Sequence, residues 1–124
     1  MEKYKELADS LYSPFDTKLI NKVVWLELDY KDYNENVLNL RIEVSYKDKG
    51  FQKYITFCLD SVKYLKIPVL STEGFRVENF TINEDYMDGT GNSIVSVSDE
   101  LGFDCHCEKI TFIQTRICLD ILDP

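Results

Sequence analysis

Apolar and polar side chains alternate through the segment from Phe103 to Leu122, with apolar or β-branched residues at most odd positions. A period of two residues is typical of a β-strand with one buried face. The segment is 20 residues long, which exceeds the usual length of a strand, so we expect an irregularity within it. The alternation is interrupted in the middle, which predicts a bulge near Lys109 or a break near Gln114 and Thr115.

Shorter segments with the same period precede it, and polar segments rich in Asp, Asn and Gly separate them. Residues 38–46 alternate most clearly, and Gly50 in the turn that follows supplies a positive φ at little cost. Residues 61–70 are ambiguous, because Pro68 cannot donate a hydrogen bond to a strand ladder. The predicted strands are residues 22–30, 38–46, 51–59, 75–82, 93–98 and the segment that starts at Phe103.

The N-terminal segment has a different period. Apolar residues recur at three- and four-residue spacing from Tyr4 to Tyr12, which predicts an amphipathic helix over about residues 2–12 that ends before Pro14. A chain of 124 residues is expected to form a single domain. The combined pattern predicts a mainly β domain over residues 1–124, an antiparallel β-sandwich or open barrel of about seven or eight strands with the short helix against it.

The overall charge argues against nucleic acids and membranes as partners. The chain has 14 Lys and Arg against 22 Asp and Glu, a formal net charge of -8 and a pI near 4.6. A protein that binds nucleic acid by itself needs cationic side chains to displace counterions from phosphate, and an anionic membrane would repel this chain as well. The first residues contain no apolar segment of the kind found in signal peptides, so we expect a cytoplasmic protein with reduced thiols.

The acidic excess is concentrated in the second half of the sequence. Residues 63–124 hold five Lys or Arg against eleven Asp or Glu, whereas residues 1–62 hold nine against eleven. An acidic surface of this kind either keeps a protein soluble or attracts a basic partner. Composition alone leaves both interpretations open.

The sequence Cys105-His106-Cys107 contains the only histidine of the chain. A zinc site needs four ligands, usually with wider cysteine spacing, and on a strand His106 would point away from both neighbours, so Cys58 and Cys118 would have to come from other strands. The same geometry argues against a cysteine nucleophile with a histidine base. Because cysteine is among the most often buried residue types, we expect these cysteines to pack in the core.

Residues 83–92 form the longest predicted polar loop. Aligning Gly89 with the required glycine of an EF-hand loop leaves two ligand positions without suitable oxygen atoms. A looser calcium site built from Asp85, Asp88 and backbone carbonyl groups remains an alternative. The Gly-x-Gly sequence lacks both the strand–helix context and the lysine of a phosphate-binding loop. We therefore expect an acidic hairpin loop that carries an aromatic side chain.

Glu27 and Asp29 would share one face of their strand, as the paired carboxylates of a glycosidase could. Arg41 and Glu43 on the neighbouring strand could instead be their cross-strand partners, with each pair contributing about 0.2–1 kcal/mol. The chain contains no nucleophile motif or metal signature elsewhere. We expect a protein that is not an enzyme, with no cofactor and no metal.

Tyrosines outside the predicted core are the best sign of a binding function. Tyr33 lies in the first predicted turn, Tyr54 on the polar face of the third strand and Tyr86 in the acidic loop. Tyrosine buries a large area at low entropic cost and keeps a polar tip, which suits interfaces. Of these residues, we expect Tyr86 in particular to lie outside the core.

The short chain, the mostly antiparallel sheet and acidic segments such as residues 84–88 and Asp99-Glu100 resemble the small acidic bacterial immunity proteins that neutralise polymorphic or contact-delivered toxins. Those families commonly cover a toxin's active site or a nearby surface, and nuclease toxins are basic. The resemblance implies binding without catalysis, with a basic, toxin-like protein as the partner.

Our first hypothesis is therefore a non-catalytic protein-binding module, in which carboxylates steer the encounter and tyrosines anchor the complex. The alternative is a module that binds a small ligand or a carbohydrate through sheet-face aromatics such as Trp25 or Tyr54. A concave, aromatic-lined groove would favour that alternative, and a convex acidic face would favour the first hypothesis. The predicted partner-binding residues are Tyr33, Glu84, Asp85, Tyr86, Asp88, Asp99 and Glu100.

Overall fold

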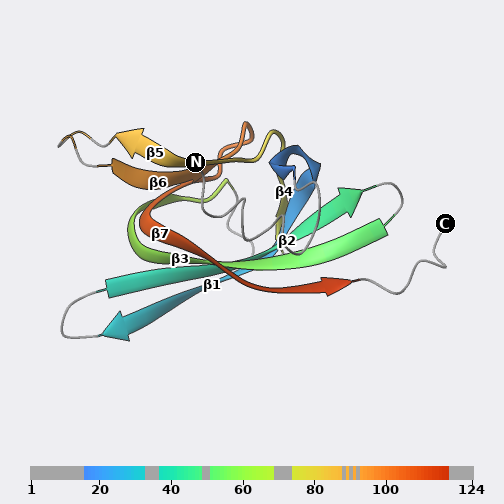
Figure 1. Cartoon of the computed structure of the whole chain (residues 1–124), viewed down its shortest axis with the longest axis horizontal. Helices are drawn as coiled ribbons and strands as arrows, with labels where there is room; N and C mark the ends of the chain where they lie inside the picture. Colours follow the sequence, from blue (N-terminus) through green and yellow to red (C-terminus); the bar gives the residue numbers. More distant parts are fainter. Residues whose placement is uncertain are drawn as a thin grey trace.

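The computed structural model describes residues 16–32, 37–48, 51–68, 74–87, 89, 91 and 93–117. They form one antiparallel sheet of seven strands in the order β4-β1-β2-β3-β7-β6-β5, curled into a half-barrel (Figure 1). The elements are η1 (Thr17–Leu19), β1 (Ile20–Asp32), β2 (Val37–Asp48), β3 (Phe51–Lys66), β4 (Phe75–Arg76), β5 (Thr81–Met87), β6 (Ser93–Ser98) and β7 (Asp104–Ile117). The predicted mainly β fold is confirmed as a single open sheet, and the helix predicted at residues 2–12 lies outside the described residues.

The two longest strands, β3 and β7, run through both halves of the curl. The first part of β3 lies between β2 and the C-terminal part of β7. The second part pairs with the N-terminal part of β7, which pairs in turn with β6. Figure 1 shows β5 and β6 above the curved strands, across the interior from β1 and β2. The two halves of the sheet therefore face each other around one core.

Ser61 marks the bend in β3. Its φ is 55°, a left-handed conformation that residues other than glycine seldom adopt. Its backbone nitrogen donates a hydrogen bond to Oδ1 of Asn39 on β2, at 3.0 Å. Before the bend, odd-numbered residues such as Leu59 point into the core, whereas after it Val62 packs there. The bend thus exchanges the inward and outward faces as far as Val62, and the register shift between Val62 and Tyr64 returns the odd-numbered Leu65 to the core.

The same exchange occurs on the neighbouring strand β7. Cys107 and Ile110 are both buried, and the two residues between them are exposed. The change falls at Lys109, where the sequence predicts an irregularity. A separate shift in register leaves Ile113 as an extra residue opposite β3, next to the predicted break at Gln114. These irregularities allow a long strand to follow the curl of the sheet.

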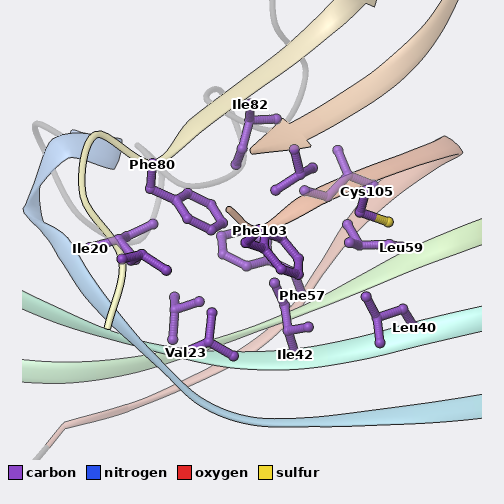
Figure 2. Packing of buried hydrophobic residues seen from close by; sticks show 14 of the residues in the cluster. Ile20, Val23, Leu40, Ile42, Phe57, Leu59, Phe80, Ile82, Phe103 and Cys105 are labelled. Carbon is purple, nitrogen blue, oxygen red and sulfur yellow. The ribbon is translucent and has the colours of Figure 1, made fainter. Parts of the chain in front are cut away.

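The hydrophobic core fills the inside of the curl. The ring centroid of Phe103 lies 6.2 Å from that of Phe80, nearly parallel to it, and 5.7 Å from that of Phe75. Figure 2 shows Phe80 and Phe103 side by side within the cluster, with Val23 and Ile42 of the lower strands beneath them. Burying each such side chain contributes about 1.5–3 kcal/mol, so these contacts hold the two halves together.

Two of the predicted boundaries are wrong. Residues 75–82 do not form one strand, because β4 and β5 are separated by residues 77–80, where Asn79 has a φ of 52°. The predicted loop at residues 83–92 is instead a strand as far as Met87. The strand β5 is the last of the sheet and most of its residues are exposed, so its sequence is polar like that of a loop.

Candidate binding surface

Three rings form a row on the outer face of the sheet, opposite the core. The ring centroid of His106 on β7 lies 5.2 Å from that of Tyr64 on β3 and 4.8 Å from that of Tyr86 on β5. The two tyrosines are 47% and 38% exposed, respectively. We call these three residues the ring surface. It joins strands that are far apart in the sequence into one exposed aromatic area.

Strand register explains why His106 lies on this face. Its cross-strand neighbours are Tyr64 on one side and Ser96 on the other. The residues before and after it, Cys105 and Cys107, are completely buried in the core. Successive side chains of a strand point to opposite faces, so the histidine points outward.

Tyr86 reaches His106 because β5 contains a bulge. Two residues, Glu84 and Asp85, occupy β5 where β6 has only one residue between its paired positions. The Asp85 backbone nitrogen donates to Oδ1 of Asn83 at 3.0 Å, which supports the local turn of the strand. A bulge of this kind increases the local twist, and here it directs the tyrosine ring towards the histidine.

Charged side chains border the ring surface. The Nε2 atom of His106 lies 3.3 Å from Oδ1 of Asp104, two residues before it on β7. Lys63 and Glu108 form an ion pair at 3.2 Å, with both side chains more than half exposed, so the pair adds little to stability. Met87, beside Tyr86 in sequence, is 58% exposed. The arrangement is an aromatic centre with a polar and mainly acidic margin, which is suited to recognition.

The structure separates the predicted partner-binding residues into two groups. Glu84, Asp85 and Tyr86 lie together on β5, and this group contains one member of the ring surface. Asp99 and Glu100 lie in the turn after β6, at the other end of that strand. The two predicted residues outside the described part of the chain are Tyr33 and Asp88.

The carboxylate of Asp99 stabilises the turn between β6 and β7 by accepting backbone hydrogen bonds. Its Oδ1 accepts hydrogen bonds from the backbone nitrogens of Gly102 and Phe103, at 3.1 and 2.8 Å. Its Oδ2 accepts a third from the backbone nitrogen of Glu78, at 2.9 Å. The side chain of Glu100 is exposed, while its backbone nitrogen donates to the Glu78 carbonyl oxygen. Asp99 therefore fixes the turn against the segment that follows β4, and Glu100 offers its carboxylate to solvent.

Sequence reasoning did not identify Tyr64 or His106 as binding residues. Tyr64 lies in the ambiguous segment 61–70, where the exchange of faces at Ser61 interrupts the alternation. The alternation did predict that His106 points away from two buried cysteines, as the structure shows, but not which side chains lie beside it. Its meeting with the tyrosines depends on cross-strand register, which a single sequence does not specify.

The thiols of Cys58 and Cys105 are protonated near neutral pH. A hydrogen bond with Cys107, together with burial, raises the pKa of the Cys105 thiol. Burial, followed by the carboxylate of Asp60 whose Oδ1 lies 3.2 Å from Sγ, raises the pKa of Cys58 to about 11. Thiols of this kind are weak nucleophiles. Among the described residues, no three His, Cys, Asp or Glu side chains are grouped so that they could hold a metal ion.

The paired carboxylates on β1 have polar neighbours across the strand. Glu27 lies directly opposite Arg41 on β2, and Asp29 lies opposite Asn39. Glu43 lies opposite Trp25 and is almost completely buried, with its Oε2 3.5 Å from Oγ1 of Thr56. This register favours the interpretation of Glu27 as a cross-strand partner rather than as a catalytic acid.

No helix in the described ranges is both long enough and apolar enough to cross a membrane. The outer face of the sheet brings the rings of Tyr64, His106 and Tyr86 together with the carboxylate of Asp104. Comparison of the chain with protein-family models, with curated protein sequences and with solved structures found no match in any of the three.

Proposed function

We propose that this protein is a non-catalytic binding module that docks its ring surface onto a basic protein partner. The observation that carries the proposal is the placement of Tyr64 and Tyr86 on either side of His106, with both tyrosines substantially exposed. The rings project from hydrogen-bonded strands and contact one another before any partner arrives. Docking would therefore cost little conformational entropy.

The composition of the surface supports a protein as the partner. Tyrosine and methionine are enriched at protein interfaces, and tyrosines often contribute most of the binding energy. Met87 lies next to Tyr86 and is exposed, and its flexible side chain can adapt to an irregular surface. His106 adds a polar ring that can form hydrogen bonds. Together they offer apolar contact area with polar groups at fixed positions.

Charge supports a basic partner. The second half of the chain, which contains β5, β6 and β7, has five Lys or Arg against eleven Asp or Glu. Asp85 and Asp104 lie on the same strands as the rings and next to them in sequence or in space. Complementary charge raises the association rate more than it raises the final affinity. Association should therefore be fast and should slow as salt is added.

The specific class that we propose is an immunity-type inhibitor of a basic, toxin-like protein, of which a nuclease is one example. Such an inhibitor acts by covering a surface and needs no reactive group of its own. The raised pKa values of the Cys58 and Cys105 thiols, and the position of Glu27 opposite Arg41 on the next strand, support a role without catalysis. The acidic and aromatic surface supplies the features that docking on a basic protein requires.

Affinity capture from the source cell would test the proposal. The chain is immobilised, partners are bound at low salt, and the proteins that elute as salt rises are identified by mass spectrometry. We expect a basic protein to be captured by the wild-type chain and lost with the double substitution Tyr64→Ala and Tyr86→Ala. Leu101→Ala is the matched control, because Leu101 is a similarly exposed apolar residue in the turn after β6.

Circular dichroism of each variant would show that the sheet is retained. Equal recovery of the partner by the double variant and the wild type would contradict a role for the ring surface. Capture that is indifferent to salt would contradict the electrostatic part of the proposal.

A further inference from the structure

A hollow lies over the half of the sheet formed by β4, β1, β2 and β3. Its volume is about 880 Å³, and the described residues that line it include Lys22, Ser45, Tyr54, Arg76 and Glu78. Ligand pockets for small molecules usually fall between about 300 and 1,000 Å³. The hollow is therefore large enough to hold one small molecule beside the sheet.

Four side chains that line the hollow come from a single cross-strand row. Arg76 of β4 pairs with Lys22 of β1, which pairs with Ser45 of β2, which pairs with Tyr54 of β3. The next row contains Val23 and other residues that are completely buried in the core. Since neighbouring rows point to opposite faces, these four side chains share the outer face.

The segment after residue 73 forms one wall of the hollow, and its position is fixed. Gly74 lies against the backbone of β1 at a φ of 92°, so closely that a Cβ atom would come within 2.3 Å of the Val23 carbonyl oxygen. The backbone nitrogen of Val77 donates to the Asn21 carbonyl oxygen at 3.0 Å. These contacts hold Arg76 beside Lys22 before any ligand binds.

Two cations face this hollow in a chain that is strongly acidic overall. Arg76 forms an ion pair with Glu78, which also lines the hollow. Lys22 has no ion-pair partner among the residues that the structure describes. The hollow therefore offers the ammonium group of Lys22, which the described residues do not pair, and one guanidinium group that a ligand could share with Glu78.

The remainder of the lining has the groups that bind hydroxyls. Gln52 donates through Nε2 to the Ser45 Oγ atom at 2.8 Å, which fixes the amide in place. Tyr54 adds an aromatic ring to the lining, and aromatic rings are common walls of sugar-binding sites because they pack against apolar sugar faces.

We propose that this hollow is a binding site for a small anionic sugar, with its phosphate or carboxylate on Lys22 and Arg76 and its hydroxyl groups on Gln52, which the buried Ser45 holds in place. The site is independent of the ring surface, which lies on the other half of the sheet. Sugar phosphates and sugar acids share this chemistry, and they differ in the charge and shape of the anionic group.

Titration of the ¹⁵N-labelled chain, followed by NMR amide shifts, tests the site with glucose 6-phosphate, glucuronate and uncharged glucose in separate experiments. We expect saturable shifts that centre on Lys22, Ser45, Tyr54 and Arg76 with at least one of the two anionic sugars. Glucose should bind about tenfold more weakly or not at all, because it cannot use the cations. Whichever of the two anionic sugars binds with the higher affinity shows whether the site prefers a phosphate or a carboxylate.

Two substitutions should change the affinity in opposite directions. Lys22→Gln should weaken binding by about tenfold, whereas Glu78→Gln should strengthen it by releasing Arg76 from its ion pair. The hydrogen bonds that Glu78 makes to Asp99 and Glu100 use only its backbone, so this substitution leaves them in place. Lys63→Gln is the control, because that lysine pairs with Glu108 outside the hollow.

The absence of saturable shifts with both anionic sugars would overturn the proposal. So would equal binding of glucose, shifts that centre on another part of the sheet, or an unchanged affinity in Lys22→Gln. The outcome is separate from that of the capture experiment, because Tyr64→Ala with Tyr86→Ala should leave sugar binding unchanged.

Discussion

Asn39 and Ser61 meet where the sheet begins to curl. The Ser61 backbone nitrogen donates to Oδ1 of Asn39 at 3.0 Å, while Ser61 itself has a φ of 55°. A left-handed serine costs free energy that its surroundings have to offset. The side chain of Asn39 supplies that compensation from the adjacent strand, so one side-chain hydrogen bond stabilises the bend through which both long strands enter the second half of the fold.

Asn39→Ala should destabilise the domain by about 1–2 kcal/mol, because the Ser61 N–H then loses its acceptor in a partly buried position. Urea denaturation monitored by circular dichroism measures the change. Asn21→Ala is the control and should change the free energy of unfolding by less than about 0.5 kcal/mol, because the side chain of Asn21 is exposed. Equal losses in the two variants would show that the bend does not depend on Asn39.

Asp99→Ala should be more damaging, with a loss of about 2–4 kcal/mol, because three backbone N–H groups share its carboxylate. The neighbouring carboxylate of Glu100 is exposed, so Glu100→Ala should stay within about 0.5 kcal/mol of the wild type. Urea midpoints of the two variants make the comparison. An Asp99→Ala variant as stable as the wild type would contradict a structural role for this carboxylate, and Asp99 would again be a candidate for contact with a partner.

Charge reversal beside the ring surface should act on the association rate. Asp85 is exposed on β5. The substitution Asp85→Lys should slow association with the captured basic partner several-fold at low ionic strength and change it little at high ionic strength. Stopped-flow or surface-based kinetics at a series of salt concentrations measure the effect. Glu27→Lys on the distant strand β1 serves as the control. An association rate that does not change with salt in the wild type would contradict electrostatic steering.

The Cys58 thiol should make the stability of the protein depend on pH in the alkaline range. Its pKa is raised from 9.0 to about 11 by burial and then by Asp60, so folding favours the neutral thiol. The corresponding stability is fully present below about pH 9 and is lost as the pH rises towards 11. Alkylation by iodoacetamide, followed by peptide mass spectrometry, should therefore be slow for Cys58 at pH 8.

Asp60→Asn should lower the pKa of Cys58, since it removes both the hydrogen bond to a carboxylate and its negative charge. Alkylation of Cys58 at about pH 9 should accordingly be faster in this variant than in the wild type. Lys63→Gln, which changes a charge elsewhere on the same strand, is the control. An unchanged alkylation rate in Asp60→Asn would assign the protection of Cys58 to burial alone.

The sequence predicts those strands whose alternation is local and regular. Residues 38–46 alternate cleanly because β2 lies between β1 and β3 and pairs with β3 without a shift in register, and the structure places a strand there. Residues 61–70 are ambiguous from sequence because of Pro68, and the alternation is also interrupted at Ser61, so the second part of β3 and Tyr64 were not identified. A positive φ at serine leaves no mark in the composition of its neighbours.

The candidate site was predicted only in part, for a related reason. Tyr86 is exposed as expected, because the acidic segment around it offers no apolar face to bury. Its position next to His106 depends on a bulge in β5 and on pairing across β6, and both are properties of the assembled sheet. The residues of a sheet surface can be guessed one at a time from sequence, but their grouping requires the register.

Tyr54 and Tyr64 stand on the same strand, separated by about 30 Å of extended backbone. One lines the hollow and the other belongs to the row of rings, with the bend at Ser61 between them. A macromolecule seated at one end would therefore leave the other end open to solvent. A single copy of the chain would be able to hold a small metabolite and a large protein simultaneously, and a continuous hydrogen-bonded strand would join the two occupied ends.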